Sequence, residues 1–270
     1  MQNHTVRRKS VTGLLIKQLV LSTALTLWCT LLFAQTTQYK KIAQRHDVYA
    51  SSAWTGTDSF RWQYNSMAWL TQLNALKGNA GNWSDIYRYT YWLNTNGQVT
   101  EQLRENWNGS AWVNNNHYLN TYDTDSNLLG VLYEVWNGGA WSSAGKIDYA
   151  GYNTHHHYGS ELVWSWNGST WIYLSKTLFQ YYPNGYQTMS EEDYNWNTGL
   201  GLWDSIERKY YTYYGDSVSS ITHSIPFNGN WFLQNKEVFT YNTTAPFLRQ
   251  TYLTQTWDTT QSPAAWLDNR

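Results

Sequence analysis

The sequence predicts an all-β fold, an antiparallel meander of about fourteen strands built from hairpin repeats of about 30 residues. Three observations lead to this prediction. Tryptophans recur in pairs at a nearly constant spacing, aromatic and polar residues alternate between the pairs, and segments rich in Asn, Asp and Gly interrupt the alternation. Alternation with a period of two is typical of strands, and the interrupting segments are typical of turns.

The repeat is clearest in three segments of the form Trp-Asn-Gly-X-X-Trp, at 107–112, 136–141 and 166–171. Their second tryptophans lie 29 and 30 residues apart. The same frame gives degenerate copies with second tryptophans at Trp54, Trp83, Trp203, Trp231 and Trp266. A tyrosine follows five of these tryptophans by ten residues, at Tyr64, Tyr122, Tyr181, Tyr213 and Tyr241. Two markers in one phase indicate a true repeat.

The junction between paired tryptophans predicts a two-residue hairpin loop. If Gly109 and Ser110 form the loop, Trp107 stands directly opposite Trp112. A loop of Asn108 and Gly109 would instead place Trp107 opposite Ser110. We favour the first register, because it pairs both tryptophans in all three clear copies and cross-strand aromatic pairs stabilise a hairpin.

Each second tryptophan is expected to begin a strand, which then meets a turn and returns. Counting alternate residues from Trp112 places Tyr118 and Tyr122 on the same face as Trp112. The return run 128–136 then leads to the next junction, as the run 99–107 does in the repeat before it.

The meander is expected to form an open, twisted sheet or a solenoid-like stack of hairpins. Seven or eight repeats would make only three to four propeller blades, at or below the small end of that architecture. A membrane-spanning β-barrel needs an uncharged lipid-facing band, but Glu101 and Glu105 lie on one face of the run 98–107 and Arg104 lies on the other. We therefore expect neither of these closed forms.

Residues 1–34 have the pattern of a signal peptide. A basic segment at 7–9 precedes the apolar run 19–34, and Gln35 would begin the mature chain. An uncleaved membrane anchor is the alternative, but the run has 16 uncharged residues, fewer than the about 20 that a membrane helix needs. Cleavage would remove Cys29, the only cysteine, so the mature chain could form no intramolecular disulfide.

The charge balance argues against a strongly basic class of protein. The whole chain has 18 Lys and Arg against 19 Asp and Glu. Loss of the leader would remove four basic residues and no acidic one, and the mature chain would have a net charge of −5. A nucleic-acid binder or a general polyanion binder usually carries the opposite excess.

The mature chain is expected to be a single repeat region, 35–270. After the junction between Trp257 and Trp266, residues 267–270 are expected to leave an unpaired partial strand. This end is typical of a fragment of a longer repeat protein.

The Trp-Asn-Gly-X-X-Trp junctions and the Tyr-Asp and Tyr-Asn turns resemble repeats in secreted and surface proteins of Bacteroidetes, many of which are cargo of the type IX secretion system. The likeness covers residues 48–270 and implies export to the cell surface. Such proteins usually carry a C-terminal sorting domain, and none is recognisable in this sequence. A weaker resemblance is to the Tyr-Asp repeats of Rhs-type shells, carried by Tyr122-Asp123, although the period here is longer.

The tryptophans of the three clear junctions are the candidate ligand-binding residues. Exposed indole rings can stack on the apolar faces of sugars or anchor a protein partner. The candidates are Trp107, Trp112, Trp136, Trp141, Trp166 and Trp171. The alternative is that these rings pack against each other, because cross-strand pairing already accounts for their positions.

Two polar clusters are weaker candidates. The segment His155-His156-His157 falls at a turn of the repeat, and consecutive residues point to alternate sides, so we expect a solvated turn and no metal site. The segment Glu191-Glu192-Asp193 has neither the spacing of a calcium loop nor carboxylates that converge across a cleft. We expect it to form a charged edge or strand face that discourages association between sheets.

No nucleophile elbow, phosphate loop or zinc-protease motif is present. A repeat distributes similar residues along the chain, whereas catalysis needs one constellation. We therefore expect a non-catalytic exported protein with a structural, binding or adhesion role at the bacterial cell surface, with glycans or cell-surface proteins as partners. The alternative is a carbohydrate-binding accessory module of a larger carbohydrate-active protein. We expect no enzyme activity, cofactor, nucleic-acid partner or membrane span in the mature chain.

Overall fold

The structure is a computed structural model of the chain. It describes residues 41–50, 53–79, 82–241, 249–259 and 264–269. The chain divides into two units, Met1–Ile42 and Ala43–Arg270, and all described strands belong to the second. The predicted signal peptide lies outside the described residues.

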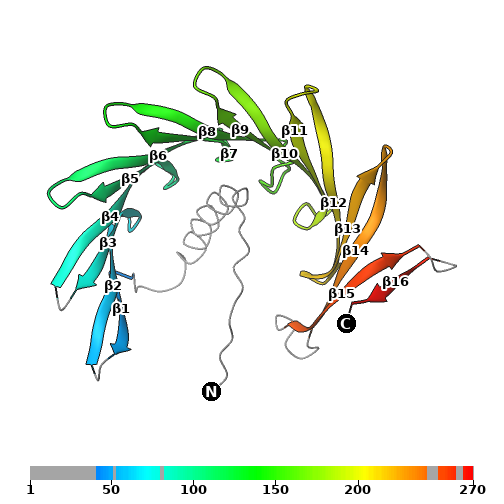
Figure 1. Cartoon of the computed structure of the whole chain (residues 1–270), viewed down its shortest axis with the longest axis horizontal. Helices are drawn as coiled ribbons and strands as arrows, with labels where there is room; N and C mark the ends of the chain where they lie inside the picture. The colour runs from blue at the N-terminus through cyan, green and yellow to red at the C-terminus, as the bar shows by residue number, and fades with distance from the viewer. Residues whose placement is uncertain (1–40, 51–52, 80–81, 242–248, 260–263, 270) are drawn as a thin grey trace. The chain divides into compact units, whose positions relative to one another are not determined.

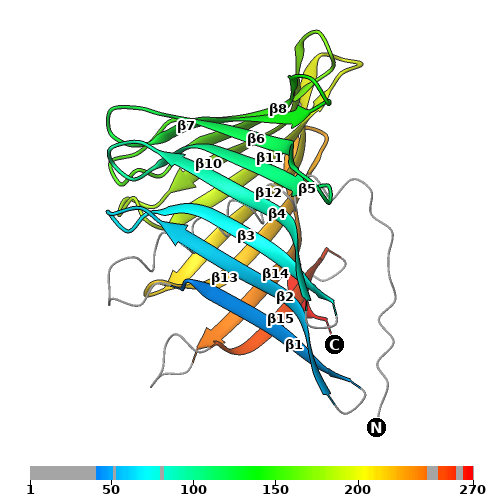
Figure 2. The same cartoon turned by 90° about the vertical axis from the view of Figure 1, so that its left-hand side faces the viewer.

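In the described part of the chain, sixteen antiparallel strands form one sheet, and each strand pairs with its neighbours in chain order (Figures 1 and 2). The strands are β1 (Ala43–Ala50), β2 (Ala53–Tyr64), β3 (Leu70–Asn79), β4 (Asn82–Leu93), β5 (Val99–Trp107), β6 (Trp112–Tyr122), β7 (Leu128–Trp136), β8 (Trp141–Ala150), β9 (Ser160–Trp166), β10 (Trp171–Tyr181), β11 (Thr188–Asn197), β12 (Leu202–Tyr214), β13 (Ser217–Phe227), β14 (Asn230–Tyr241), β15 (Arg249–Asp258) and β16 (Ala265–Asp268). The sheet is open, because β1 and β16 each pair with a single neighbour. The predicted all-β meander is confirmed, with sixteen strands where about fourteen were expected.

The hairpin tips adopt the predicted register. Trp107 stands opposite Trp112, and the backbone N–H of Asn108 donates to the carbonyl of Ala111 at 3.1 Å. The side-chain oxygen of Asn108 accepts hydrogen bonds from the backbone N–H groups of Ser110 and Ala111, both at 2.9 Å. The same bonds form at Asn137 and Asn167 in the next two junctions. An asparagine at this position therefore holds the loop closed from inside the turn.

The turns at the other ends of the strands use the same side-chain chemistry. The side-chain oxygen of Asn94 accepts from the backbone N–H of Asn96 and of Gln98. Neighbouring turns are also joined, since the Gln98 amide donates to the carbonyl of Ser126 at 2.8 Å. Asn153 and Gln187 make equivalent bonds to the carbonyls of Gly185 and Gly215 in the turn that follows each of them.

The tyrosine marker of the repeat is a hydrogen-bond donor. The hydroxyl of Tyr122 donates to the carbonyl of Val99 at 2.9 Å, across the open end of the hairpin formed by β5 and β6. Three other members of the series bond to backbone carbonyls in the same way: Tyr181 to Tyr158, Tyr213 to Thr188 and Tyr241 to Val218. Both sequence markers thus fix hairpin register, one at each end of the strands.

The sequence predicted that Tyr118 and Tyr122 lie on the same face of β6 as Trp112. This prediction is wrong beyond the third residue of the strand. Asn114 pairs with Glu105 and Asn116 pairs with Arg104, so a β-bulge intervenes at position 115. The extra residue inverts the alternation, and Tyr118 therefore lies on the face opposite to Trp112. Bulges recur along the sheet, and exposed apolar side chains such as Leu174 and Ile206 lie at them.

Few side chains in the described sheet are buried. The buried apolar residues are Ala75, Leu76, Val99 and Ile147, and most other strand positions are half-buried. Cross-strand contacts, more than a thick core, therefore stabilise this layer. The sequence predicted an unpaired partial strand at the end of the chain. This prediction is wrong, because Ala265–Asp268 pairs with Gln255–Asp258 of β15.

Candidate functional site

The two faces of the sheet carry different chemistry. Residues paired across strands share a face, and residues two apart along an unbroken strand share it as well. We call the side that bears Trp107 and Trp112 the tryptophan face. The opposite side bears Tyr89 and Tyr118, and we call it the tyrosine face.

The six predicted tryptophans lie in three close pairs on the tryptophan face. The ring centres are 5.3 Å apart in the first pair and 5.1 Å apart in the other two, and all six side chains are half-buried. The degenerate copies Trp196–Trp203 and Trp257–Trp266 form equivalent pairs. The pairing that the sequence favoured is confirmed, whereas ligand binding by these rings stays a prediction.

A basic side chain covers the second indole of successive junctions. It lies five residues after the second tryptophan of one repeat and reaches the second tryptophan of the next. The contacts are Arg88 over Trp112 at 4.6 Å, Lys146 over Trp171 at 5.6 Å, Lys176 over Trp203 at 4.9 Å and Arg208 over Trp231 at 4.4 Å, with the ring of His117 4.9 Å from the ring of Trp141. We call this series the cation ladder. Contacts of this kind contribute about 0.5–1 kcal/mol at exposed sites and more when desolvated.

Carboxylates complete several rungs of the cation ladder. Arg88 pairs with Glu105 through two hydrogen bonds, and Glu105 is only 8 % exposed. His117 lies between Glu101, at 2.8 Å, and Glu134, at 3.1 Å. Because the buried carboxylate of Glu105 is paired with Arg88, this rung avoids the cost of an isolated buried ion.

Sequence reasoning missed the cation ladder, although its signal was present. Arg88, His117, Lys146, Lys176, Arg208 and Lys236 all fall five residues after a second tryptophan. The ladder connects consecutive hairpins on the same face that carries the indole pairs. In the three clear junctions, the second indole therefore contacts its partner indole and a basic side chain from the preceding repeat.

The three histidines lie in a turn, as predicted, and point to different partners. The ring of His155 packs against the ring of Tyr186 in a tilted arrangement, with ring centres 3.9 Å apart. His156 Nδ1 lies 2.7 Å from the side-chain oxygen of Asn127, and His157 Nδ1 lies 3.0 Å from the carbonyl of Gly185. Within the described residues, no group of three or more His, Cys, Asp or Glu side chains is arranged to hold a metal ion.

The acidic segment lies on both faces of an interior strand and at no edge of the sheet. Glu191 and Asp193 are on the tyrosine face of β11, whereas Glu192 is on the tryptophan face and pairs with Arg208 at 2.6 Å. The sequence had left open whether this segment formed an edge or a strand face. The neighbouring strands β10 and β12 supply the hydrogen-bonding and charged partners.

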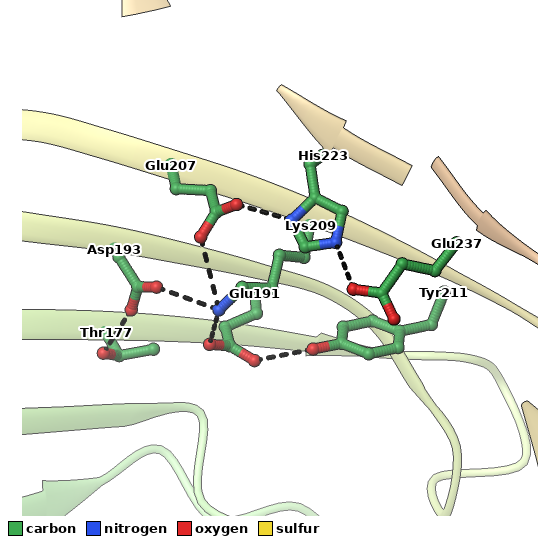
Figure 3. A network of polar contacts seen from close by, with 8 residues as sticks. All are labelled: Thr177, Glu191, Asp193, Glu207, Lys209, Tyr211, His223 and Glu237. Carbon is green, nitrogen blue, oxygen red and sulfur yellow. Dashed lines mark hydrogen bonds and ion pairs between the residues drawn. The ribbon is translucent and has the colours of Figure 1, made fainter. Parts of the chain in front are cut away.

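Glu191 and Asp193 belong to a polar network on the tyrosine face (Figure 3). Lys209 Nζ lies 2.8 Å from Glu191, 3.2 Å from Asp193 and 3.6 Å from Glu207. The outer members extend it over further strands: Thr177 donates to Asp193, Tyr211 donates to Glu191, and His223 lies between Glu207 and Glu237.

The network holds its central ammonium in the charged form. Burial acts to lower the pKa of Lys209, but the hydrogen bonds and negative charges of Glu191 and Asp193 prevail and raise it above the usual range. Burial, together with Glu191, also raises the pKa of Tyr211. Lys209 therefore stays protonated and joins β12 to β11.

No protein-family model and no curated protein matches the chain. Among solved structures, it is similar to a protein of unknown function from Bacteroides fragilis, at 16 % identity over 56 % of this chain and 91 % of that chain, with a TM-score of 0.30. It is also similar to a DUF3836 family protein from Bacteroides vulgatus, at 17 % identity over 40 % and 96 %, with a TM-score of 0.24. A porin-like protein from Bacteroides uniformis matches at 13 % identity over 72 % and 92 %, with a TM-score of 0.32. At these TM-scores the likeness supports no statement about function.

The described part of the chain contains no helix with the length and apolar character needed to cross a membrane.

Proposed function

We propose that this chain is a non-catalytic, exported protein that serves as a structural or binding element at the bacterial cell surface. The observation that supports this proposal most directly is the repetition of one stabilising device, an indole pair covered by a cation, on successive hairpins. Repetition creates an extended surface with recurring side chains. An active site, in contrast, needs one constellation of unlike groups.

The leader pattern of residues 1–34 supports the exported location. A single-layer sheet with two half-exposed faces offers a large surface to neighbours, which suits a scaffold or an adhesive element. A chain without cysteine after the leader would depend on backbone pairing and its ladders for stability outside the cell.

Export can be tested with the full chain, carrying a C-terminal epitope tag, in a bacterium of the Bacteroidetes. We expect the mature chain to begin at Gln35 by mass spectrometry and the tag to be digested when intact cells are treated with protease. Leu25→Arg is the matched control, because a charge in the apolar run should block export. Recovery of the uncleaved wild-type chain from the cytoplasm would overturn the proposal.

A further inference from the structure

Arg104 lies among four tyrosines on the tyrosine face. Its guanidinium carbon is 4.9 Å from the ring centre of Tyr87 and 5.9 Å from that of Tyr89. Tyr118 and Tyr133 stack on each other in the strands beyond, with ring centres 4.9 Å apart and planes inclined by 29°. We call these five residues the Arg104 cluster. It spans β4 to β7, and all five side chains are half-buried.

Arg104 lacks the acceptor that comparable arginines have. Its Nε is buried without a hydrogen-bond partner, and no carboxylate of the described residues forms an ion pair with it. Arg88 and Arg208, which also lie over aromatic rings, pair with Glu105 and Glu192. The Nε of Arg208 also has no hydrogen-bond partner, so the missing carboxylate, and not the Nε alone, distinguishes Arg104. A buried donor without an acceptor costs about 1–3 kcal/mol, so its retention needs a reason.

The positive charge of Arg104 acts on the surrounding rings. Burial raises the pKa of Tyr133, and Arg104 opposes this rise. Burial, with the neighbouring Tyr133 and Tyr89, raises the pKa of Tyr118 to about 12, again against the influence of Arg104. Tyr118 and Tyr133 therefore stay neutral at ordinary pH and do not compensate the charge of the guanidinium. Within the described chain, the hydroxyls of Tyr87, Tyr89 and Tyr133 donate to no residue, so the cluster offers donors without acceptors.

We propose that the Arg104 cluster binds an acidic saccharide, with the guanidinium of Arg104 bonded to the carboxylate and the tyrosine rings packed against the sugar. A guanidinium matches a carboxylate with two parallel hydrogen bonds, and the rings supply the apolar platform that a sugar face needs. The mature chain is acidic overall, so the carboxylate is a single one on an otherwise neutral saccharide, because a long polyanion would be repelled. This proposal concerns binding by the purified chain and does not depend on where the protein is located.

Two disaccharides that differ in one carboxylate measure how much this group contributes to binding. Cellobiouronic acid, which is glucuronosyl-glucose, differs from cellobiose only in carrying a carboxylate in place of a hydroxymethyl group. Isothermal titration of the full chain should show binding of cellobiouronic acid and at least about tenfold weaker binding of cellobiose. Equal affinity for the two sugars, or no binding of the acidic one, would overturn the proposal. So would equally tight binding of N-acetylglutamate, which would identify an acidic peptide site instead.

Two variants test whether Arg104 binds the saccharide. Arg104→Gln should weaken binding of cellobiouronic acid by about tenfold or more, since it removes a charge-assisted pair. Lys176→Gln is the matched control, because Lys176 also lies over aromatic rings, but on the tryptophan face, and its affinity should stay within about twofold of wild type. Unchanged affinity in Arg104→Gln would overturn the proposal.

A folding control accompanies these measurements. If Arg104→Gln loses the strand circular dichroism of the wild type, the comparison passes to Arg104→Lys and Tyr133→Phe. The first keeps the charge without the planar fork, and the second removes one hydroxyl but keeps the ring. Weaker binding in either variant supports the site, and wild-type affinity in both would overturn it.

Discussion

Gly138 and Gly139 are adjacent in one hairpin loop and have different backbone requirements. Gly138 has a φ of +93°, whereas Gly139 is outside the positive-φ region, and a Cβ added to either would meet nothing within 4 Å. Only backbone strain therefore distinguishes the two positions. A side chain at positive φ costs about 1–2 kcal/mol, while alanine at a compatible glycine position gains about 0.4–1 kcal/mol by restricting the unfolded chain.

We therefore expect Gly138→Ala to lower the free energy of unfolding by at least about 1 kcal/mol, and Gly139→Ala to leave it unchanged or raise it slightly. Urea titrations followed by far-ultraviolet circular dichroism measure both, and Gly139→Ala is the control for the added methyl group. Equal effects of the two substitutions would show that φ does not determine the choice of glycine here.

At the scale of the hairpin, the sequence was sufficient wherever a local rule applies. The Trp-Asn-Gly-X-X-Trp spacing predicted the loop and the pairing of Trp107 with Trp112, because two-residue loops fix register. The faces of β6 could not be predicted, because counting by two assumes an unbroken pleat and the bulge at position 115 breaks it. The cation ladder was missed for a related reason. Its partners, such as Arg88 in β4 and Trp112 in β6, lie two strands apart, and their contact across β5 can be predicted only once the register of both strand pairs is known.

The rung formed by Arg88 and Glu105 provides a test of the cation ladder. Arg88→Gln leaves Glu105 nearly buried without its partner and uncovers Trp112, so the free energy of unfolding should fall by on the order of 3 kcal/mol. The double variant Arg88→Gln/Glu105→Gln has no unpaired charge and should recover most of this loss.

A double-mutant cycle in urea, read from tryptophan fluorescence and circular dichroism, gives the coupling between the two side chains. Glu105→Gln completes the cycle. If the two single changes simply add in the double variant, Arg88 and Glu105 do not stabilise the rung as a pair.

At the scale of the whole described sheet, half-buried tyrosine rings supply much of the packing that a hydrophobic core would otherwise provide. Buried apolar residues are few, and half-buried phenol rings lie along many strands. Burial is the main reason that the pKa values of Tyr118, Tyr152 and Tyr194 rise to about 12. These rings come from separate hairpins. Their combined titration therefore reports on the folding of the whole described sheet and not on the state of a single site.

This pattern predicts loss of stability at high pH. A tyrosine in the unfolded chain titrates near pH 10, and the folded chain holds the proton up to about pH 12, so the folded state binds protons more tightly in this window. The stabilisation is therefore complete below about pH 10 and disappears as the pH rises towards 12. Lys209, whose pKa is also raised, acts in the same direction.

Urea midpoints between pH 7 and 12 should be nearly constant at first and then fall together with the appearance of tyrosinate absorbance. Tyr118→Phe should make this fall shallower, because it removes one titrating group. A midpoint that stays constant through pH 12 would show that the buried rings do not couple ionisation to folding.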